Sequence, residues 1–280
     1  MDETACTETI GKGKGGIMTT IKDQYFSGER PLYASRDLQL SNVTIGEGES
    51  GLKESRGVEA VGCRFEGKYV IWECEDVECR NCCFAASDRA PLWYDRNLRM
   101  YGCLIDAPKA FREIDGLTIG NVRMSDGTEA FWRCRGGQIS GLRMENGSYP
   151  FFQSENLRIH QLRLVGKYAF QYARHIEIRN AVLDTKDAFW ESKDCVVYDS
   201  ELKGEYLGWY ARNLRLVRCH ISGTQPLCYC RNLVLEDCTF APDADLAFEY
   251  SSVRATIIGK VTSVKNPLPG STICEKPQTE

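Results

Sequence analysis

The stretch Ala188-Phe189-Trp190-Glu191-Ser192 holds a pattern that recurs along most of this 280-residue chain, at a fixed distance from a second pattern, Asn-Leu-x-Leu. When the apolar residue after the Asn-like position is numbered 0, all five tryptophans fall at position −5. The position-0 residues recur every 19 to 21 residues, and they are Leu38, Val58, Val77, Leu98, Leu117, Gly137, Leu157, Ile176, Cys195, Leu214, Leu233 and Val253. Twelve units at so regular a spacing predict a repeat protein.

Each unit contains two short apolar strands separated by polar corners. Positions 0 and +2 alternate as in a strand, for example Leu214 and Leu216, and a second inward pair follows at +5 and +7, for example Cys219 and Ile221. Positions −1 and +4 are Asn, Asp or Gly in most units. These residue types tolerate a left-handed backbone or bond their own turn, so we expect tight corners on both sides of the first strand.

The pattern favours a parallel β-helix of about 12 coils, with successive coils roughly 4.8 Å apart. A leucine-rich repeat is the main alternative, because Leu-x-Leu followed by Asn or Cys also describes that fold. Two observations disfavour it: position −3 is small, as in Ser192 and Ala211, and no stretch has the period of an amphipathic helix. We expect an N-terminal extension and cap over residues 1–29, the β-helix over 30–258, and a C-terminal cap or tail over 259–280.

Several segments spread along the chain resemble the signature segments of one bacterial family. They are residues 24–30 (QYFSGER), 52–55 (LKES), 188–192 (AFWES), 204–209 (GEYLGW), 246–251 (LAFEYS) and 263–267 (SVKNP). The family is known only as domain of unknown function 3737. The resemblance implies a single right-handed β-helix, similar in fold to pectate lyases. It implies no activity, substrate or catalytic residue.

Composition and charge narrow the class of partner. A net charge of −4 gives no electrostatic footprint for nucleic acid. The first 31 residues contain no apolar run long enough for a signal peptide or a membrane span. We therefore expect a cytoplasmic protein without nucleic-acid or membrane partners. Fourteen cysteines in a chain of this size favour reduced thiols that pack as small hydrophobes over a framework of disulfides.

Position −6 is apolar, so positions −5 and −4 are expected to point outward and to form ladders on one face. The candidate ligand-binding residues on these ladders are Trp72, Trp93, Tyr94, Arg112, Trp132, Arg133, Trp190, Glu191, Trp209, Tyr210 and Tyr229. Phe248 is assigned to the same outward position as the tryptophans. The leading hypothesis is a track that binds or processes carbohydrate, in which aromatic faces stack on sugar rings.

Two other interpretations of this face remain open. Stacked aromatic side chains stabilise a sheet by themselves, through buried area and ring contacts. An exposed apolar stripe is also typical of a protein interface, so the chain could be a non-catalytic scaffold that binds another protein or itself through the same face.

The best candidates for catalysis are Glu54, Glu73 and Glu113, which share position −4. Adjacent coils would place two such carboxylates ~5 Å apart, and a two-coil separation ~10 Å, against ~5 to 9.5 Å in glycosidases. An enzyme of this kind would be a polysaccharide lyase or a glycoside hydrolase. Glu75, Asp95 and Asp115 lie within two residues of the same position. Alternatively, these acids form solvated ion pairs with the arginines that recur at position −2.

Cysteines suggest a metal site only weakly. Cys79-x-x-Cys82-Cys83 resembles half of a zinc site, but Cys79 and Cys82 fall in inward positions. Cys63, Cys82 and Cys103 share position +5, which predicts a packed cysteine stack instead.

No other motif points to a metal or a cofactor. The three histidines occupy three different positions of the repeat, and Asp76, Asp95 and Asp115 are the only candidate group for calcium. We expect neither a metal nor a cofactor. The expected partner is an oligosaccharide or sugar conjugate, or a second copy of the chain.

Overall fold

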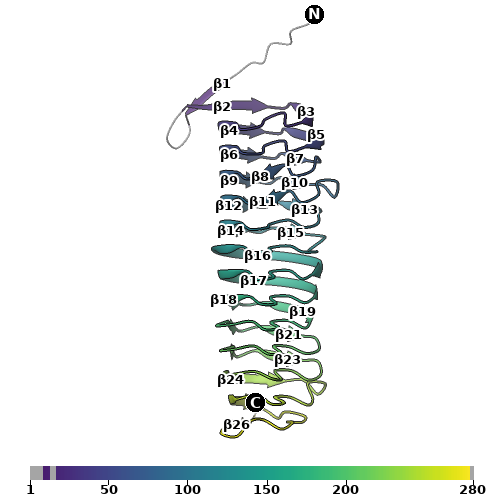
Figure 1. The fold of residues 1–280 in the computed structure, drawn as a ribbon, viewed down its shortest axis with the longest axis vertical. Coiled ribbons are helices and arrows are strands. Elements are labelled where there is room, and N and C mark those ends of the chain that lie inside the picture. Colours follow the sequence, from purple (N-terminus) through teal and green to yellow (C-terminus); the bar gives the residue numbers. More distant parts are fainter. Residues whose placement is uncertain (1–8, 13–16, 278–280) are drawn as a thin grey trace, which may run out of the picture.

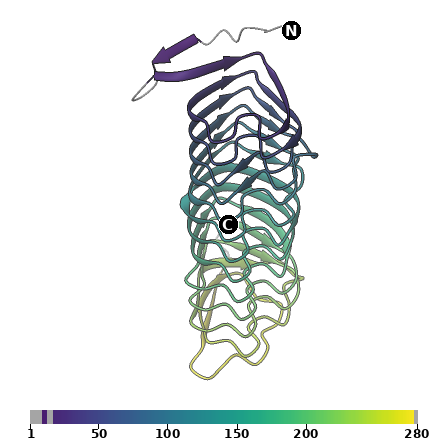
Figure 2. The same ribbon diagram turned by 45° about the horizontal axis from the view of Figure 1, so that its top comes forward.

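The computed structural model describes residues 9–12 and 17–277, and every regular element in this part of the chain is a β-strand. The strands stack coil upon coil into a right-handed parallel β-helix (Figure 1). Successive coils have a similar outline and lie over one another along the rod (Figure 2). This confirms the predicted fold. Within the described ranges there is no helix that could cross a membrane.

The first strand of each coil forms a ladder of fourteen strands. They are β2 (Ile17–Lys22), β4 (Arg36–Ser41), β6 (Arg56–Val61), β9 (Glu75–Arg80), β12 (Arg96–Tyr101), β14 (Asp115–Gly120), β16 (Arg135–Ser148), β17 (Glu155–Lys167), β18 (Arg174–Arg179), β20 (Val196–Tyr198), β22 (Arg215–Val217), β24 (Leu233–Phe240), β25 (Val253–Ile258) and β26 (Thr272–Lys276). The position-0 residues pair in register, as Val77 does with Leu98. The ladder therefore has one more strand at each end, β2 and β26, than the twelve repeat units.

The second strand of the coils forms another parallel ladder. It contains β3 (Tyr25–Glu29), β5 (Thr44–Glu49), β7 (Arg64–Phe65), β10 (Cys83–Phe84), β13 (Leu104–Ile105), β15 (Arg123–Met124), β19 (Val182–Lys186), β21 (Glu201–Lys203) and β23 (His220–Ser222), and the long strands β16, β17 and β24 run through both ladders. At the N-terminal end, β1 (Thr9–Lys12) pairs with β2 in antiparallel fashion.

The corners on both sides of the first strand are those that the sequence predicts. Position −1 has a positive φ in residues such as Asp76 and Asn97, with values of 55° and 54°, and position +4 does in Asn81 and Asn121, with values of 52° and 53°. The polar and glycine residues found there accept this conformation at low cost.

The third side of each coil has less regular structure. In the described part of the chain, the strands on this side are β8 (Ile71–Trp72) and β11 (Leu92–Trp93), and isolated bridges continue the stacking, for example between Trp93 and Arg112. Left-handed residues recur at positions −6 and −4, including Phe189 at 60° and Glu191 at 49°. These corners carry bulky side chains, so they cannot be predicted from residue type.

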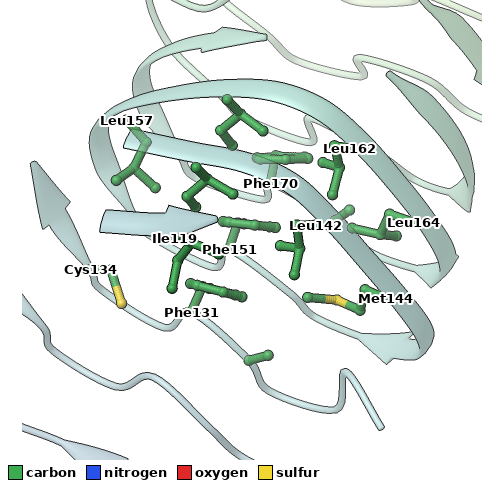
Figure 3. Close-up of a cluster of buried hydrophobic side chains, with 14 of the residues drawn as sticks. Ile119, Phe131, Cys134, Leu142, Met144, Phe151, Leu157, Leu162, Leu164 and Phe170 are labelled. Atoms are coloured by element: carbon green, nitrogen blue, oxygen red, sulfur yellow. The ribbon is translucent and has the colours of Figure 1, made fainter. Parts of the chain in front are cut away.

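The core is a set of stacks that run along the rod axis. Phe111, Phe131, Phe151, Phe170 and Phe189 are fully buried, and successive ring centroids lie 4.3 to 5.0 Å apart with nearly parallel planes. Figure 3 shows Phe131, Phe151 and Phe170 of this stack lying over one another. Cysteines form similar interior stacks: Cys63, Cys82 and Cys103 are buried, as predicted. All thirteen cysteines in the described part of the chain are free thiols, and Cys6 lies outside it.

In the last repeat unit, the segment before position 0 is displaced by one residue relative to the other units, which corrects the assignment of Phe248. Its ring is buried with 0% exposure instead of pointing outward. The backbone N–H of Tyr229 donates to the carbonyl of Glu249, and Tyr250 takes the place in the outward column that position −4 predicts for Glu249.

Candidate functional site

Three columns of outward side chains run along one side of the rod, at positions −5, −4 and −2. The tryptophan column at −5 comprises Lys53, Trp72, Trp93, Arg112, Trp132, Phe152, Gln171, Trp190 and Trp209. The corner column at −4 comprises Glu54, Glu73, Tyr94, Glu113, Arg133, Gln153, Tyr172, Glu191, Tyr210 and Tyr229, followed by the displaced Tyr250. The charged column at −2 comprises Arg36, Arg56, Glu75, Arg96, Asp115, Arg135, Glu155, Arg174, Lys193, Arg212 and Arg231.

A groove runs between the corner column and the charged column, because the residue between them at −3 turns inward. One stretch has a volume of about 540 Å³ and is lined by residues from Glu113 to Arg174. A second stretch of about 280 Å³ is lined by Glu191, Tyr210, Arg212, Tyr229 and Arg231. The groove spans several coils and offers both rings and charges.

The tryptophans are partly exposed, but their ring faces are covered. Trp72 stacks on Trp93 at 5.2 Å between ring centroids, Trp132 on Phe152 at 4.9 Å, and Trp190 on Trp209 at 5.5 Å. Three indole N–H groups are also fixed, because Trp93, Trp132 and Trp209 each donate to a backbone carbonyl of the next coil at 2.7 to 2.8 Å. The tryptophans therefore present edges, not faces, to a ligand.

Arg112 fills the gap between two of these pairs. Its guanidinium lies 4.3 Å from the ring centroid of Trp93 and 4.6 Å from that of Trp132. Glu129 holds it at 2.9 Å and also contacts Lys109 at 3.0 Å. Only 19% of the Arg112 side chain is exposed. The guanidinium of Arg112 therefore makes its contacts within the protein. The tryptophan column is a ladder that stabilises the fold, as cross-strand side-chain pairs do in a sheet.

Tyrosines dominate the corner column in the C-terminal half. Tyr210 stacks on Tyr229 with centroids 4.9 Å apart and planes 14° apart, and Tyr229 stacks on Tyr250 at 5.9 Å. Tyr210 is 43% exposed. Glu191 interrupts the run between Tyr172 and Tyr210, and its exposed carboxylate has no hydrogen bond or ion pair among the described residues. This half of the column offers hydroxyl groups, ring edges and one free acid.

The three predicted catalytic glutamates lie in the N-terminal half of the corner column. Lys53 sits between Glu54 and Glu73, at 3.8 and 3.5 Å, and the hydroxyl of Tyr33 donates to Glu54 at 2.6 Å. That hydrogen bond raises the pKa of Tyr33. The carboxylates of Glu54 and Glu73 therefore share one lysine, which offsets part of their combined charge.

Glu113 lies apart from the other two glutamates. Tyr94 stands between Glu73 and Glu113 in the column and packs against Trp72 at 5.5 Å between centroids. Glu113 pairs with Arg133 at 3.5 Å, and Arg133 also donates to Gln153 at 3.0 Å. Each of the three predicted acids thus has a cation as its nearest charged partner.

Asp95 corrects the predicted acidic group, because its side chain points into the core with 0% exposure. It occupies position −3, where Ser154 Oγ accepts a hydrogen bond from the backbone N–H of Cys134 at 3.0 Å, and Asp95 Oδ1 accepts in the same way from Cys74 at 2.8 Å. Burial raises its pKa well above the ordinary 3.8, because it disfavours the charged form of the carboxyl group.

This removes Asp95 as a base and as a calcium ligand in the group with Asp76 and Asp115. Among residues 9–12 and 17–277, no group of three or more His, Cys, Asp or Glu side chains could hold a metal ion. The pattern at −3 could have revealed this, since that position is small and inward in most units.

The charged column contains an order that the predicted arginine stack missed. From Arg56 to Arg174 the sign alternates coil by coil, through Glu75, Arg96, Asp115, Arg135 and Glu155. Neighbours pair directly where the geometry allows, as Arg56 does with Glu75 at 3.4 Å and Arg135 with Glu155 at 3.3 Å. After Glu155 the alternation stops, and four cations follow one another in register: Arg174, Lys193, Arg212 and Arg231.

Comparison with solved structures yields β-helix proteins of low similarity. The surface adhesin PfbA of Streptococcus pneumoniae is 9% identical over 85% of this chain and 82% of its own, with a TM-score of 0.37. A mutant of the periplasmic alginate epimerase AlgG is 10% identical over 94% of this chain and 75% of its own, with a TM-score of 0.34. Scores this low say nothing about function.

Comparison with curated proteins finds no match. The profile of one protein family matches residues 19–279, nearly the whole of the stacked coils. That family is DUF3737, described as protein of unknown function, and the chain belongs to it.

Proposed function

We propose that this protein binds a carbohydrate chain in the groove between the corner column and the charged column. The observation that carries the proposal is the pair of walls in the C-terminal half, where tyrosine rings and hydroxyls face arginine and lysine donors along several coils. Sugars present apolar C–H groups and hydroxyls side by side, and an amphipathic tyrosine together with a multidentate guanidinium complements both.

The ligand would be centred on Glu191. Tyr172 and Tyr210 flank Glu191 in the corner column, so their Cα atoms are separated by two coils, roughly 10 Å. This leaves room above Glu191 for one flat ring between two aromatic side chains. The carboxylate of Glu191 then accepts hydrogen bonds from sugar hydroxyls, and Arg212 lies across the groove from it.

The tryptophans act in this proposal as supports and reporters, not as stacking platforms. Trp190 contacts Tyr210 at 5.4 Å between ring centroids, and Trp209 contacts Tyr229 at 5.2 Å. A ligand that moves either tyrosine changes the surroundings of an indole. Intrinsic tryptophan fluorescence is therefore expected to respond to binding in the groove.

We propose binding without a catalytic step. Glu54, Glu73 and Glu113 lie in the other half, and each is tied to a cation at 3.5 to 3.8 Å. An acid-base pair in a glycosidase needs one carboxyl group held protonated and the other free. Of the three glutamates, Glu113 lines the stretch of the groove that reaches Arg174.

The test is a titration of the protein with a panel of neutral and acidic oligosaccharides, followed by tryptophan fluorescence and calorimetry. We expect saturable binding that Tyr210→Ala weakens about tenfold, the loss of about 1.4 kcal/mol of ring contact. Tyr198→Ala is the matched control, because Tyr198 packs on Arg179 on a different strand face. No response across the panel from a protein that forms a stable dimer would refute the proposal and favour the scaffold that associates through its aromatic face.

A further inference from the structure

The run of four cations in the charged column points to the charge of the ligand. Building on the proposed carbohydrate site, we infer that the groove takes an acidic glycan, a polysaccharide with a carboxylate on successive residues, and that its carboxylates lie along Arg174, Lys193, Arg212 and Arg231. The inference adds the substrate class, which the tyrosine wall alone leaves open.

The charged column has a different order of acidic and basic residues in its two halves. From Arg56 to Arg174 every cation has an acid in register on an adjacent coil. Beyond Arg174, three successive contacts in register bring cation against cation. Like charges directly opposite each other on neighbouring strands destabilise a sheet, so this run has an energetic cost that the alternation from Arg56 to Arg174 avoids.

Side chains of the protein do little to offset that cost. Arg174 and Arg212 have no ion pair among the described residues, and Arg231 donates only to the backbone carbonyls of Cys230 and Tyr250. Lys193 reaches Asp194 at 3.9 Å, but Asp194 is also shared with His175 at 3.5 Å and Asn213.

Glu191 is the one other acid that lines this stretch. In that stretch Arg212 and Arg231 face one free carboxylate, and Arg174 and Lys193 add two further cations in register. A bound polyanion would supply the missing acids.

Geometry favours a sugar polymer over a single anion. Coils repeat at ~4.8 Å, so the four cations span ~14 Å in a straight line. That repeat is comparable to the length of one residue in an extended polysaccharide. Each guanidinium can hold a planar carboxylate through two parallel hydrogen bonds, and the tyrosines on the opposite wall contact the sugar rings between the charges. A small anion would use only one or two of the cations and none of the rings.

The experiment uses oligogalacturonate and its fully methyl-esterified form, which share one backbone and differ in charge. Calorimetry at low and moderate salt should show that the acid form binds at least tenfold more tightly and that its affinity falls as salt rises. Arg212→Gln should weaken the acid form about tenfold, and Lys193→Gln should act in the same direction. Arg143→Gln is the matched control, because Arg143 is an exposed arginine stacked in register with other arginines on the second ladder, off the groove.

Each alternative outcome has a separate meaning. Equal affinity for both forms, with Tyr210→Ala still harmful, would overturn the acidic-glycan inference and leave carbohydrate binding in place. Inorganic polyphosphate that binds as tightly as oligogalacturonate would also overturn it, since charge alone would then suffice. Equal losses from Arg143→Gln and Arg212→Gln would remove the groove as the site of the charge. No binding of any glycan would instead refute the proposed function itself.

Discussion

The two halves of the groove are built on one repeat but use its outward positions in opposite ways. In the N-terminal half, acids and bases alternate along the charged column from Arg56 onward, and the glutamates of the corner column are each held by a cation such as Lys53 or Arg133. In the C-terminal half, tyrosines replace the glutamates and the cations run uninterrupted from Arg174 to Arg231. Since backbone and core continue through both, the difference is carried by surface side chains alone. The N-terminal half therefore pairs its surface cations with acids of its own, whereas the C-terminal half has a run of cations without acidic partners in register.

The largest expected effect tests whether the halves are one structural unit. Phe151 stacks between Phe131 and Phe170 at 4.6 Å to each, near the middle of the rod. Phe151→Ala should lower the free energy of unfolding by about 3–5 kcal/mol, because it opens a cavity in a stack that spans both halves. Chemical denaturation followed by circular dichroism and by tryptophan fluorescence should give coincident transitions at reduced denaturant concentration. Phe152→Ala, on the outward side, is the control and should cost far less; two separate transitions in the parent protein would show that the halves unfold independently.

The second prediction concerns Asp95, a buried acid in the N-terminal half where the C-terminal half has small residues such as Ser192 and Ala211. Its folded pKa is raised by burial, so its contribution to stability is present below about pH 3.9 and is lost as pH rises toward the folded pKa. The slope is about 1.4 kcal/mol per pH unit within that window. Asp95→Ser, which keeps the hydrogen bond to Cys74, should stabilise the protein at pH 7.

Melting temperatures of both proteins from pH 4 to pH 7 provide the measurement. The gap should widen as pH rises. Asp88 is also buried and has a raised pKa, so the variant should retain part of the pH dependence. A gap that stays constant with pH would mean that Asp95 is ionised in the folded protein.

How far the sequence predicts this molecule depends on how local each cause is. The strands and corners follow from residue type at fixed positions: Asn97 sits where a left-handed turn is needed, and Leu98 pairs in register with Val77 as the repeat requires. The inward place of Asp95 was also readable, because position −3 is small and inward in neighbouring units. The prediction places Asp95 among the exposed acids because it carries a carboxyl group, although its position in the repeat determines whether the side chain is buried.

Other features of the site depend on contacts between coils, which a pattern along one chain does not contain. The ring faces of Trp93 and Trp132 are hidden because Arg112 lies between them, which depends on rotamers. The corner at Glu191 is left-handed although glutamate does not signal it. The run of cations at Arg174, Lys193, Arg212 and Arg231 is by contrast readable from position −2 of the repeat, but a grouping by arginine alone leaves Lys193 out.

A charge reversal at Lys193 tests directly whether the difference in charge order between the two halves matters for binding. Lys193→Glu extends the alternation of the N-terminal half into the C-terminal half, between Arg174 and Arg212. We expect binding of oligogalacturonate to fall by about 30- to 100-fold, a loss of about 2–3 kcal/mol from a charge-assisted contact that becomes repulsive. Stability should rise by about 0.5 kcal/mol, because two like-charge contacts become attractive. Calorimetric titration and thermal melting measure the two effects; a variant that binds as well as the parent would show that the cation run is not part of the site.

The smallest expected effect compares the spacers of the tryptophan column. Arg112 fills the gap between Trp93 and Trp132 in the N-terminal half, and the buried Gln171 fills the corresponding gap between Phe152 and Trp190. Arg112→Gln gives the first gap the chemistry of the second. It removes two cation–π contacts and the pair with Glu129, so the free energy of unfolding should fall by about 1–2 kcal/mol.

Arg112→Lys should recover little of that loss, since an ammonium group lacks the flat surface that lies between the two indoles. Tryptophan emission should shift in both variants, while affinity for a ligand in the C-terminal half should stay within twofold of the parent, about 0.4 kcal/mol. A loss of affinity in Arg112→Gln comparable to that of Tyr210→Ala would mean that the tryptophan column contacts the ligand after all. The ligand site would then extend into the N-terminal half and include Arg112.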